Sequence, residues 1–176
     1  MLTPLELRVV KDHKIHGFVA FLQGMYFRFG KLEIELPRKK YPSREFLIET
    51  LDKIDKRKGD FDFEYAELAQ EEVNPLVLEQ QGWELLSPRI GRYVQCSRQF
   101  VDAYTPEQVN EETAEQLRIL SRDGFGLIKK WNILSRSFDG KYELAIYGVT
   151  DLRLRTAEES ANTLRALIEE LSSPVR

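Results

Sequence analysis

The chain has 176 residues, of which 42% are hydrophobic and 31% charged, with a formal net charge of −3. That length suffices for one domain with a sizeable core, and no run of 18 apolar residues is present to cross a membrane. The first residues lack the basic and apolar segments of a secretory signal, and Cys96, the one cysteine, has no partner for an internal disulfide. We therefore expect a cytoplasmic protein with no membrane association.

The charge is unevenly distributed along the chain. Residues 1–59 carry 13 basic residues (Lys or Arg) and 8 acidic ones (Asp or Glu). Residues 60–89 carry 1 basic residue and 8 acidic ones. The two blocks can pair within the fold, or the basic block can face a phosphate backbone. Because the whole chain is acidic, non-specific nucleic-acid binding is the less expected of the two.

The first third predicts a meander of strands followed by a helix. The expected strands are Leu5–Val10, Gly17–Leu22, Met25–Phe29 and Leu32–Leu36, separated by short turns. Gly17–Leu22 is apolar on both faces, so a helix layer or a partner should cover it on two sides. A helix is expected at Ser43–Lys58, where Leu47, Leu51 and Ile54 form one stripe and Gly59 supplies the C-terminal cap.

The next segment, Asp60-Phe61-Asp62-Phe63-Glu64-Tyr65, alternates carboxylates with aromatic side chains. On an extended strand this period of two places Asp60, Asp62 and Glu64 on one face. Three carboxylates on one face predict a site for Mg²⁺ or Mn²⁺. The alternative interpretation is a half-buried strand whose acidic face meets water, which is the more common use of the pattern.

The remainder alternates helices with strands. The expected elements are a helix at Asn74–Gln81 ended by Gly82, strands at Trp83–Leu86 and Arg92–Val101 around a Ser87-Pro88 turn, a helix at Thr105–Ser121 ended by Gly124, a hairpin of Phe125–Ser137 and Lys141–Val149 around Asp139-Gly140, and a final helix at Thr156–Leu171. In the final helix, Leu164 and Ile168 lie on the stripe that should be buried against the hairpin.

This order predicts an α+β fold with a mainly antiparallel sheet and helices packed on one face. From Arg92 onward, the order strand-helix-strand-strand-helix matches most of a ferredoxin-like unit. We expect residues 1–176 to form a single domain, with a sub-division near residues 70–90 as the alternative.

One stretch resembles a known family. Pro75–Arg98, with Gln81-Gly82-Trp83-Glu84-Leu85-Leu86 followed by Arg92-Tyr93-Val94, resembles the opening of restriction-endonuclease-like domains. The resemblance implies a Glu-x-Lys pair on the second strand, which would help to hold Mg²⁺ near a scissile phosphate. This chain has Gln95-Cys96-Ser97 there, so the resemblance implies a site that lacks this pair.

Three further groups of residues are candidate binding or catalytic sites. Arg38, Lys39 and Lys40, beside Tyr41, form the densest basic cluster and could contact phosphates or nucleic acid, although a solvated loop is the usual role of such a cluster. His13 and His16 lack the further ligands that a zinc site needs. Cys96 lacks a neighbouring base, so a packed structural role is expected.

No nucleophile or acid–base set assembles from these residues, so we expect a non-catalytic protein that binds another protein or forms a homo-oligomer, with no cofactor. The first alternative is a metal-dependent phosphoesterase or nuclease-like enzyme that uses the acidic strand and Mg²⁺ or Mn²⁺. The second alternative is a nucleic-acid-binding module in which Lys129, Lys130, Arg136 and Lys141 lie on or beside a wing.

Overall fold

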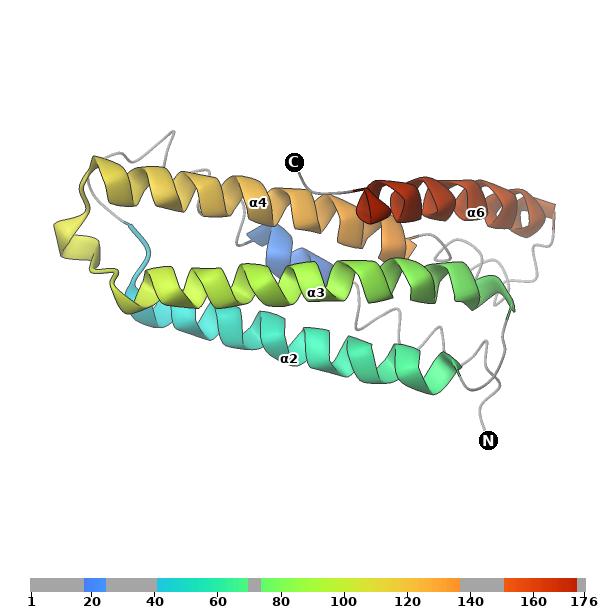
Figure 1. Cartoon of the computed structure of the whole chain (residues 1–176), viewed down its shortest axis with the longest axis horizontal. Coiled ribbons are helices and arrows are strands. Elements are labelled where there is room, and N and C mark those ends of the chain that lie inside the picture. The colour runs from blue at the N-terminus through green and yellow to red at the C-terminus, as the bar shows by residue number, and fades with distance from the viewer. Residues whose placement is uncertain (1–17, 25–40, 70–73, 137–150, 174–176) are drawn as a thin grey trace.

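The computed structural model describes residues 18–24, 41–69, 74–136 and 151–173, and within these ranges it contains helices and no strand. The elements are a helix at 18–24, α2 (Arg44–Ala69), α3 (Asn74–Asp102), the short 3₁₀ helix η1 (Pro106–Gln108), α4 (Glu111–Arg136) and α6 (Asp151–Ser172). The described chain is therefore a helical bundle (Figure 1). The predicted α+β fold, with its antiparallel sheet and ferredoxin-like C-terminal part, is wrong.

The helix α3 is the centre of the bundle and contacts α2, α4 and α6. Figure 1 shows α2 beside α3 along its length, α4 beside α3 from its C-terminal end to beyond its middle, and α6 beside its N-terminal half. The helix at 18–24 also belongs to the core, because Phe18, Val19 and Leu22 are buried. The strand predicted at Gly17–Leu22 is thus a helix over the residues that the structure describes.

An aromatic cluster joins four of these helices. Its members are Phe18, Phe61, Tyr65, Trp83 and Trp131, all of them buried. The ring centroids of Phe18 and Trp131 lie 3.8 Å apart, and that of Trp83 lies 4.2 Å from Phe61 and 4.3 Å from Trp131. Large aromatic side chains in mutual contact bury much apolar surface, so this cluster is the main hydrophobic core where the helices meet.

The helix predicted at Ser43–Lys58 is confirmed, but α2 continues to Ala69. The Ser43 hydroxyl accepts a hydrogen bond from the Phe46 backbone N–H at 3.1 Å and so caps the N-terminus. Gly59 lies inside the helix and does not end it. The acidic-aromatic segment is therefore helical, and Phe61 and Tyr65, four residues apart, are buried while Phe63 is 69% exposed.

The helix predicted at Asn74–Gln81 is helical, but α3 continues to Asp102 and so covers both predicted strands as well. Its buried hydrophobic residues recur every three or four positions: Trp83, Leu86, Ile90, Tyr93, Val94 and Val101. Pro88 lies within the helix, where it removes one backbone donor. Gly82 lies within it as well. The predicted Ser87-Pro88 turn is therefore wrong, and so is the strand pair implied by the resemblance to restriction-endonuclease-like domains.

Two helices follow with shifted boundaries. Thr105 precedes η1 without making a side-chain cap, and α4 begins at Glu111, where the Asn110 Oδ1 accepts from the Thr113 backbone N–H at 2.9 Å. Gly124 and the segment predicted as the strand Phe125–Ser137 lie in α4 up to Arg136, so Lys129 and Lys130 are helical and not on a wing. In α6, Leu164 is buried as predicted, but it packs among helices.

Several predicted features lie outside the described residues. They are the strands Leu5–Val10, Met25–Phe29 and Leu32–Leu36, the basic cluster Arg38, Lys39 and Lys40, the histidines His13 and His16, and the Asp139-Gly140 turn with Lys141–Val149.

Candidate functional site

The three carboxylates predicted to bind a metal do not share a face. They lie on α2, where successive residues are turned by about 100°, so Asp62 points away from the side that carries Asp60 and Glu64. Asp60 is exposed, Asp62 is half-buried and Glu64 is buried. Among the described residues, no group of three or more His, Cys, Asp or Glu side chains is placed to hold a metal ion. The geometry on which the Mg²⁺ or Mn²⁺ prediction depended is therefore absent from the described residues.

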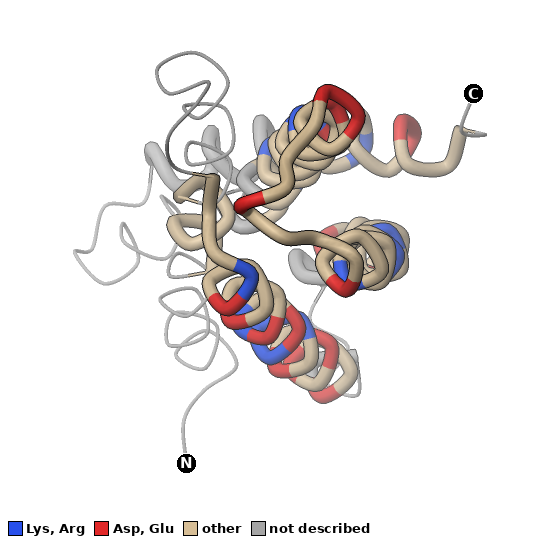
Figure 2. The backbone as a smooth tube through the Cα atoms, turned by 90° about the vertical axis from the view of Figure 1, so that its left-hand side faces the viewer, with Lys and Arg blue, Asp and Glu red and all other residues tan. Residues whose placement is uncertain are grey.

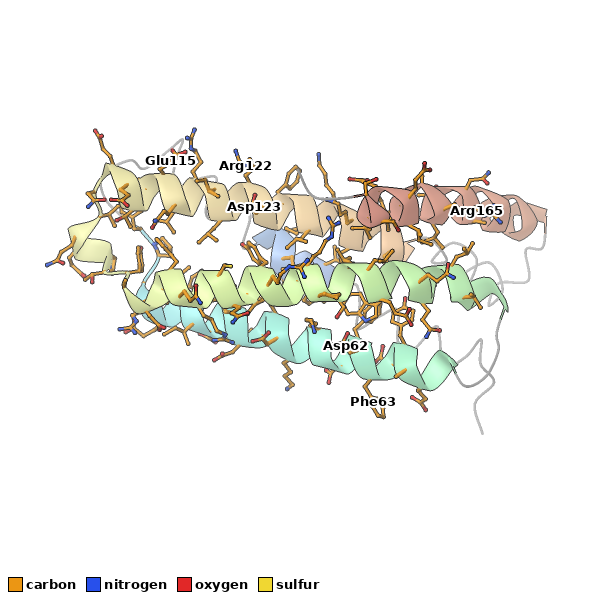
Figure 3. All side chains as sticks on the ribbon, in the orientation of Figure 1. Asp62, Phe63, Glu115, Arg122, Asp123 and Arg165 are labelled. Carbon is orange, nitrogen blue, oxygen red and sulfur yellow. The ribbon has the colours of Figure 1, made fainter. Side chains whose placement is uncertain are left out.

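Asp62 instead joins α2 to α3. Its Oδ1 accepts hydrogen bonds from the Trp83 indole Nε1 at 2.9 Å and from the Ser87 hydroxyl at 2.5 Å, and its Oδ2 pairs with the Lys58 Nζ at 2.8 Å. Figure 3 shows Asp62 on the side of α2 that faces α3, with Phe63 directed away from the bundle. Because the carboxylate satisfies two donors on α3, its role is structural.

A second buried polar contact joins the same two helices. The Tyr65 hydroxyl donates to the Glu79 carboxylate at 2.5 Å, and the Glu79 side chain is fully buried. The ring of Tyr65 belongs to the aromatic cluster, at 4.3 Å from Phe61. This contact therefore anchors the N-terminal part of α3 to the core.

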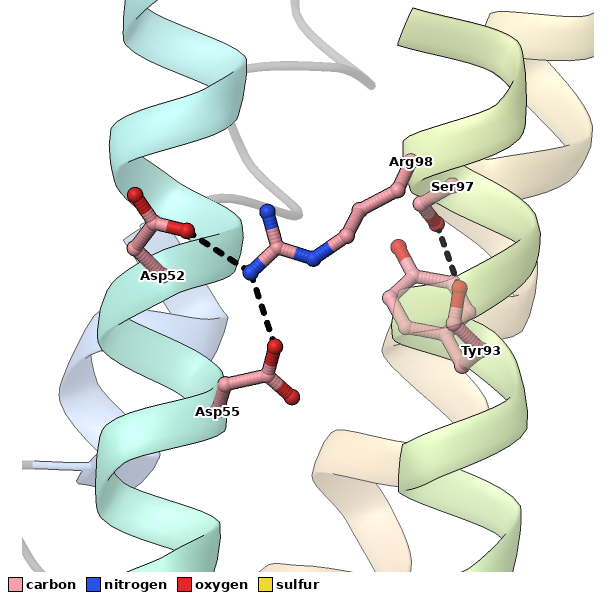
Figure 4. Close-up of polar contacts among 5 residues, drawn as sticks. All are labelled: Asp52, Asp55, Tyr93, Ser97 and Arg98. Carbon is pink, nitrogen blue, oxygen red and sulfur yellow. Dashed lines mark hydrogen bonds and ion pairs between the residues drawn. The ribbon is translucent and has the colours of Figure 1, made fainter.

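Farther along α3, Arg98 reaches across to α2. Its Nη2 lies 2.7 Å from both Asp52 Oδ1 and Asp55 Oδ2 (Figure 4). The hydrogen bond to Asp55 raises the pKa of Arg98 above its ordinary value. Nearby, the Ser97 hydroxyl donates to the backbone carbonyl of Tyr93 at 2.7 Å, within α3. The arginine fixes the α2–α3 pair near its partly exposed edge.

On the other side of α3, a groove of about 570 Å³ lies between the C-terminal part of α3 and the N-terminal part of α4. We call it the α3–α4 groove. Its lining comprises Cys96, Gln99, Phe100, Ala103 and Tyr104 from α3 and the turn after it, and Glu112, Thr113, Gln116, Ile119 and Leu120 from α4. In each of the two sets the residues recur every three or four positions, singly or as adjacent pairs. Each helix therefore contributes one face to the groove.

Part of the lining of the α3–α4 groove is apolar. Phe100 and Leu120 are half-buried, Tyr104 is buried and Ile119 is 37% exposed. The rings of Phe100 and Tyr104 are 5.4 Å apart between centroids. Polar side chains from both helices, including Gln99 and Gln116, also line the groove. A lining that combines apolar with polar side chains is usual for a surface that binds another molecule.

Two tyrosines hold the walls of the groove in place. The Tyr93 hydroxyl donates to the backbone carbonyl of Leu120 at 2.9 Å and so ties α3 to α4. The Tyr104 hydroxyl donates to the backbone carbonyl of Pro42 at 2.7 Å and so ties the end of α3 to the segment before α2. Burial raises the pKa of Tyr104 to about 12, with smaller contributions from Tyr41 and Glu107. Both hydroxyls are therefore protonated at neutral pH and serve as donors.

Cys96 differs from its predicted structural role. It is an exposed free thiol that lines the α3–α4 groove. On a helix, Arg98 lies two positions farther on and points to α2, so the two residues do not share a face as they would on a strand. Cys96, Phe100 and Ala103 lie at helical spacing, which is the sequence signal that the strand interpretation missed.

Comparison of the chain with protein-family models, with curated proteins and with solved structures found no match. Within the described ranges, no helix combines the length and apolar character needed to span a membrane.

Proposed function

We propose that this chain is a non-catalytic helical protein that binds a segment of another protein in the α3–α4 groove. The observation that carries this proposal is the groove itself, whose lining includes the apolar and aromatic side chains Phe100, Tyr104, Ile119 and Leu120 beside polar ones. Protein interfaces likewise combine apolar and aromatic side chains with polar ones.

The dimensions of the groove favour a short helical ligand. From Cys96 to Asp102, α3 contributes six steps of about 1.5 Å, or roughly 9 Å, which is somewhat less than two helical turns, and Ala103 follows in the turn after it. A ligand helix of that length presents side chains at i, i+3 or i+4, and i+7. The apolar side chains of such a stripe would contact the apolar part of the groove lining. The exposed free thiol of Cys96 fits the reducing cytosol that we include in the proposal.

The test uses three fluorescent amphipathic helical peptides that share one leucine stripe and carry basic, neutral or acidic polar faces. Fluorescence anisotropy should show that at least one binds the wild-type protein. Ala103→Trp should weaken that binding at least tenfold, because Ala103 is an exposed groove residue and the indole would occupy the space. Ala66→Trp, at an exposed position of α2, is the matched control and should bind as the wild type does.

Circular dichroism melts of the two tryptophan variants check that both are folded. If none of the three peptides binds at millimolar concentration, the proposal is wrong. If a peptide binds equally well to wild type and to Ala103→Trp, binding occurs elsewhere and the assignment to this groove is also wrong.

A further inference from the structure

The end of the α3–α4 groove near η1 carries a concentration of negative charge. Between Gln99 and Gln116 the sequence has five carboxylates, namely Asp102, Glu107, Glu111, Glu112 and Glu115, and neither Lys nor Arg. Glu112 is the one charged residue in the groove lining, at this end of it. Figure 2, which views the bundle from this end, shows acidic positions on the connection between α3 and α4 and at the start of α4.

Ion pairs neutralise only part of this charge. Asp102 lies 3.8 Å from Arg44, and Glu115 pairs with Arg118. None of the salt bridges between described residues involves Glu107, Glu111 or Glu112, and all three are exposed. These three carboxylates are available to a cationic ligand at this end of the groove.

Helix stability accounts for some of the carboxylates but not for the whole cluster. Glu111 and Glu112 lie in the first turn of α4, where negative charge interacts favourably with the helix dipole. Asp102 is the last residue of α3, where the dipole makes negative charge unfavourable. Glu107 lies in η1, a 3₁₀ helix of three residues, where the dipole contributes little. The dipole accounts for Glu111 and Glu112. Arg44 partly neutralises Asp102, which leaves Glu107 without a local explanation. The exposed carboxylates of Glu107, Glu111 and Glu112 together place a negative charge that would attract a cationic side chain of a ligand.

We infer that the ligand of the α3–α4 groove is an amphipathic helical segment of another protein, about two turns long, with an apolar stripe and Lys or Arg side chains at the end that meets η1. This inference rests on the proposed function and adds the chemistry of the partner. Leucine-sized side chains would contact Phe100, Ile119 and Leu120, and the cations would approach Glu112 and its acidic neighbours. Charges at the border of an interface chiefly select the partner and speed its association.

The test compares the basic, neutral and acidic peptides at low and at physiological salt. The basic peptide should bind most tightly, and added salt should weaken its binding while leaving that of the neutral peptide nearly unchanged. Glu112→Gln should weaken the basic peptide by about two- to fivefold, as expected for one exposed ion pair. The triple variant Glu107→Gln/Glu111→Gln/Glu112→Gln should abolish the preference for the basic peptide.

Glu169→Gln is the matched control, since Glu169 is an exposed carboxylate on α6. It should not change binding. If the neutral or acidic peptide binds as tightly as the basic one, and salt has no effect, the inferred partner chemistry is wrong while the groove remains a binding site. If light scattering shows a dimer that Ala103→Trp dissociates, the ligand is a second copy of the chain and the inference is overturned. If no peptide binds and the protein is monomeric, both the proposed function and this inference fail.

Discussion

Replacing Gly82 with alanine tests how closely α3 approaches α4 and α6. A Cβ atom at this position would lie 3.1 Å from the Leu134 Cδ1, 3.9 Å from the Leu167 Cδ2 and 4.0 Å from the Ile168 Cγ1. Two carbon atoms pack best at about 3.5–4.0 Å, so Leu134 would have to move by a few tenths of an ångström. Leu134 is fully buried, and its neighbours resist that movement.

The magnitude follows from two opposing effects. Alanine is favoured over glycine inside a helix by about 1 kcal/mol, whereas added volume in a packed core typically costs about 1–3 kcal/mol. We expect Gly82→Ala to lower the free energy of unfolding by roughly 0–2 kcal/mol. Gly59→Ala is the matched control, because no atom lies within 4 Å of its Cβ and Gly59 is an exposed residue inside α2. It should raise the free energy of unfolding by about 0.5–1 kcal/mol.

Urea denaturation of the two variants and the wild type measures both changes, and an unchanged slope with urea confirms that the same structure unfolds. The expected order of stability is Gly59→Ala, then wild type, then Gly82→Ala. If Gly82→Ala were as stabilising as Gly59→Ala, the close approach of α3 to α4 and α6 would be refuted.

Three further predictions concern single side chains. Asp62→Ala should lower the free energy of unfolding by about 1–3 kcal/mol, because the buried Trp83 indole N–H and the Ser87 hydroxyl lose their acceptor. In the same urea titration, Asp60→Ala, at an exposed position, should change the free energy of unfolding by less than about 0.5 kcal/mol. Equal effects of the two substitutions would contradict the role given to Asp62. The pKa of Tyr104 is raised from 10.0 to about 12, so between these values the folded state keeps a proton that the unfolded state releases. The stability of the wild type relative to Tyr104→Phe should therefore fall as pH rises from about 10 to about 12. Denaturant titrations that show a constant difference across that range would rule this out. Leu164→Ala should lower the free energy of unfolding by about 2–5 kcal/mol, since Leu164 is fully buried. Glu169→Ala, at an exposed position, should lower it by less than about 0.5 kcal/mol. Calorimetry of both variants tests whether α6 is packed through Leu164, and equal effects would show that it is not.

The sequence allowed parts of four helices to be predicted: the beginning of α2, residues 74–81 of α3, residues 111–121 of α4 and the body of α6. The beginning of α2 and the body of α6 combine apolar residues at helical spacing with charged residues between them, and Ser43 caps α2 as a serine commonly does. Residues 60–65 were ambiguous, because Phe61, Phe63 and Tyr65 fit a period of two. The distinguishing fact is that Phe63 is exposed while Phe61 and Tyr65 are buried, and only the three-dimensional packing reveals it.

The middle of the chain differs from the prediction because glycine and proline commonly end helices, whereas Gly82 and Pro88 lie inside α3. Gly82 and Pro88 are unfavourable inside a helix by about 1 and 3 kcal/mol. Tertiary contacts compensate: Gly82 permits close packing against Leu134, and Trp83 enters the aromatic cluster. Such long-range packing overrides local preference, and a single sequence does not display it.

The candidate site could not be predicted for the same reason. The spacing of Cys96, Phe100 and Ala103 shows a common face once α3 is known to be helical. The opposite wall, including Gln116 and Ile119, follows only from the packing of α4 against α3. The acidic stretch around Glu112 is visible in the sequence, but its position beside the α3–α4 groove is not.

The reactivity of Cys96 gives the most direct test of the proposed function, because it is the single cysteine of the chain, it is exposed and it lines the α3–α4 groove. The measurement is the rate of alkylation of the wild-type protein by iodoacetamide, with and without a saturating concentration of the basic amphipathic peptide. A ligand in the groove should slow the reaction at least tenfold, and the triple Glu-to-Gln variant should need a higher concentration of the basic peptide to reach the same protection. An alkylation rate that the bound peptide leaves unchanged would contradict the account, because it would show that the peptide does not occupy the groove.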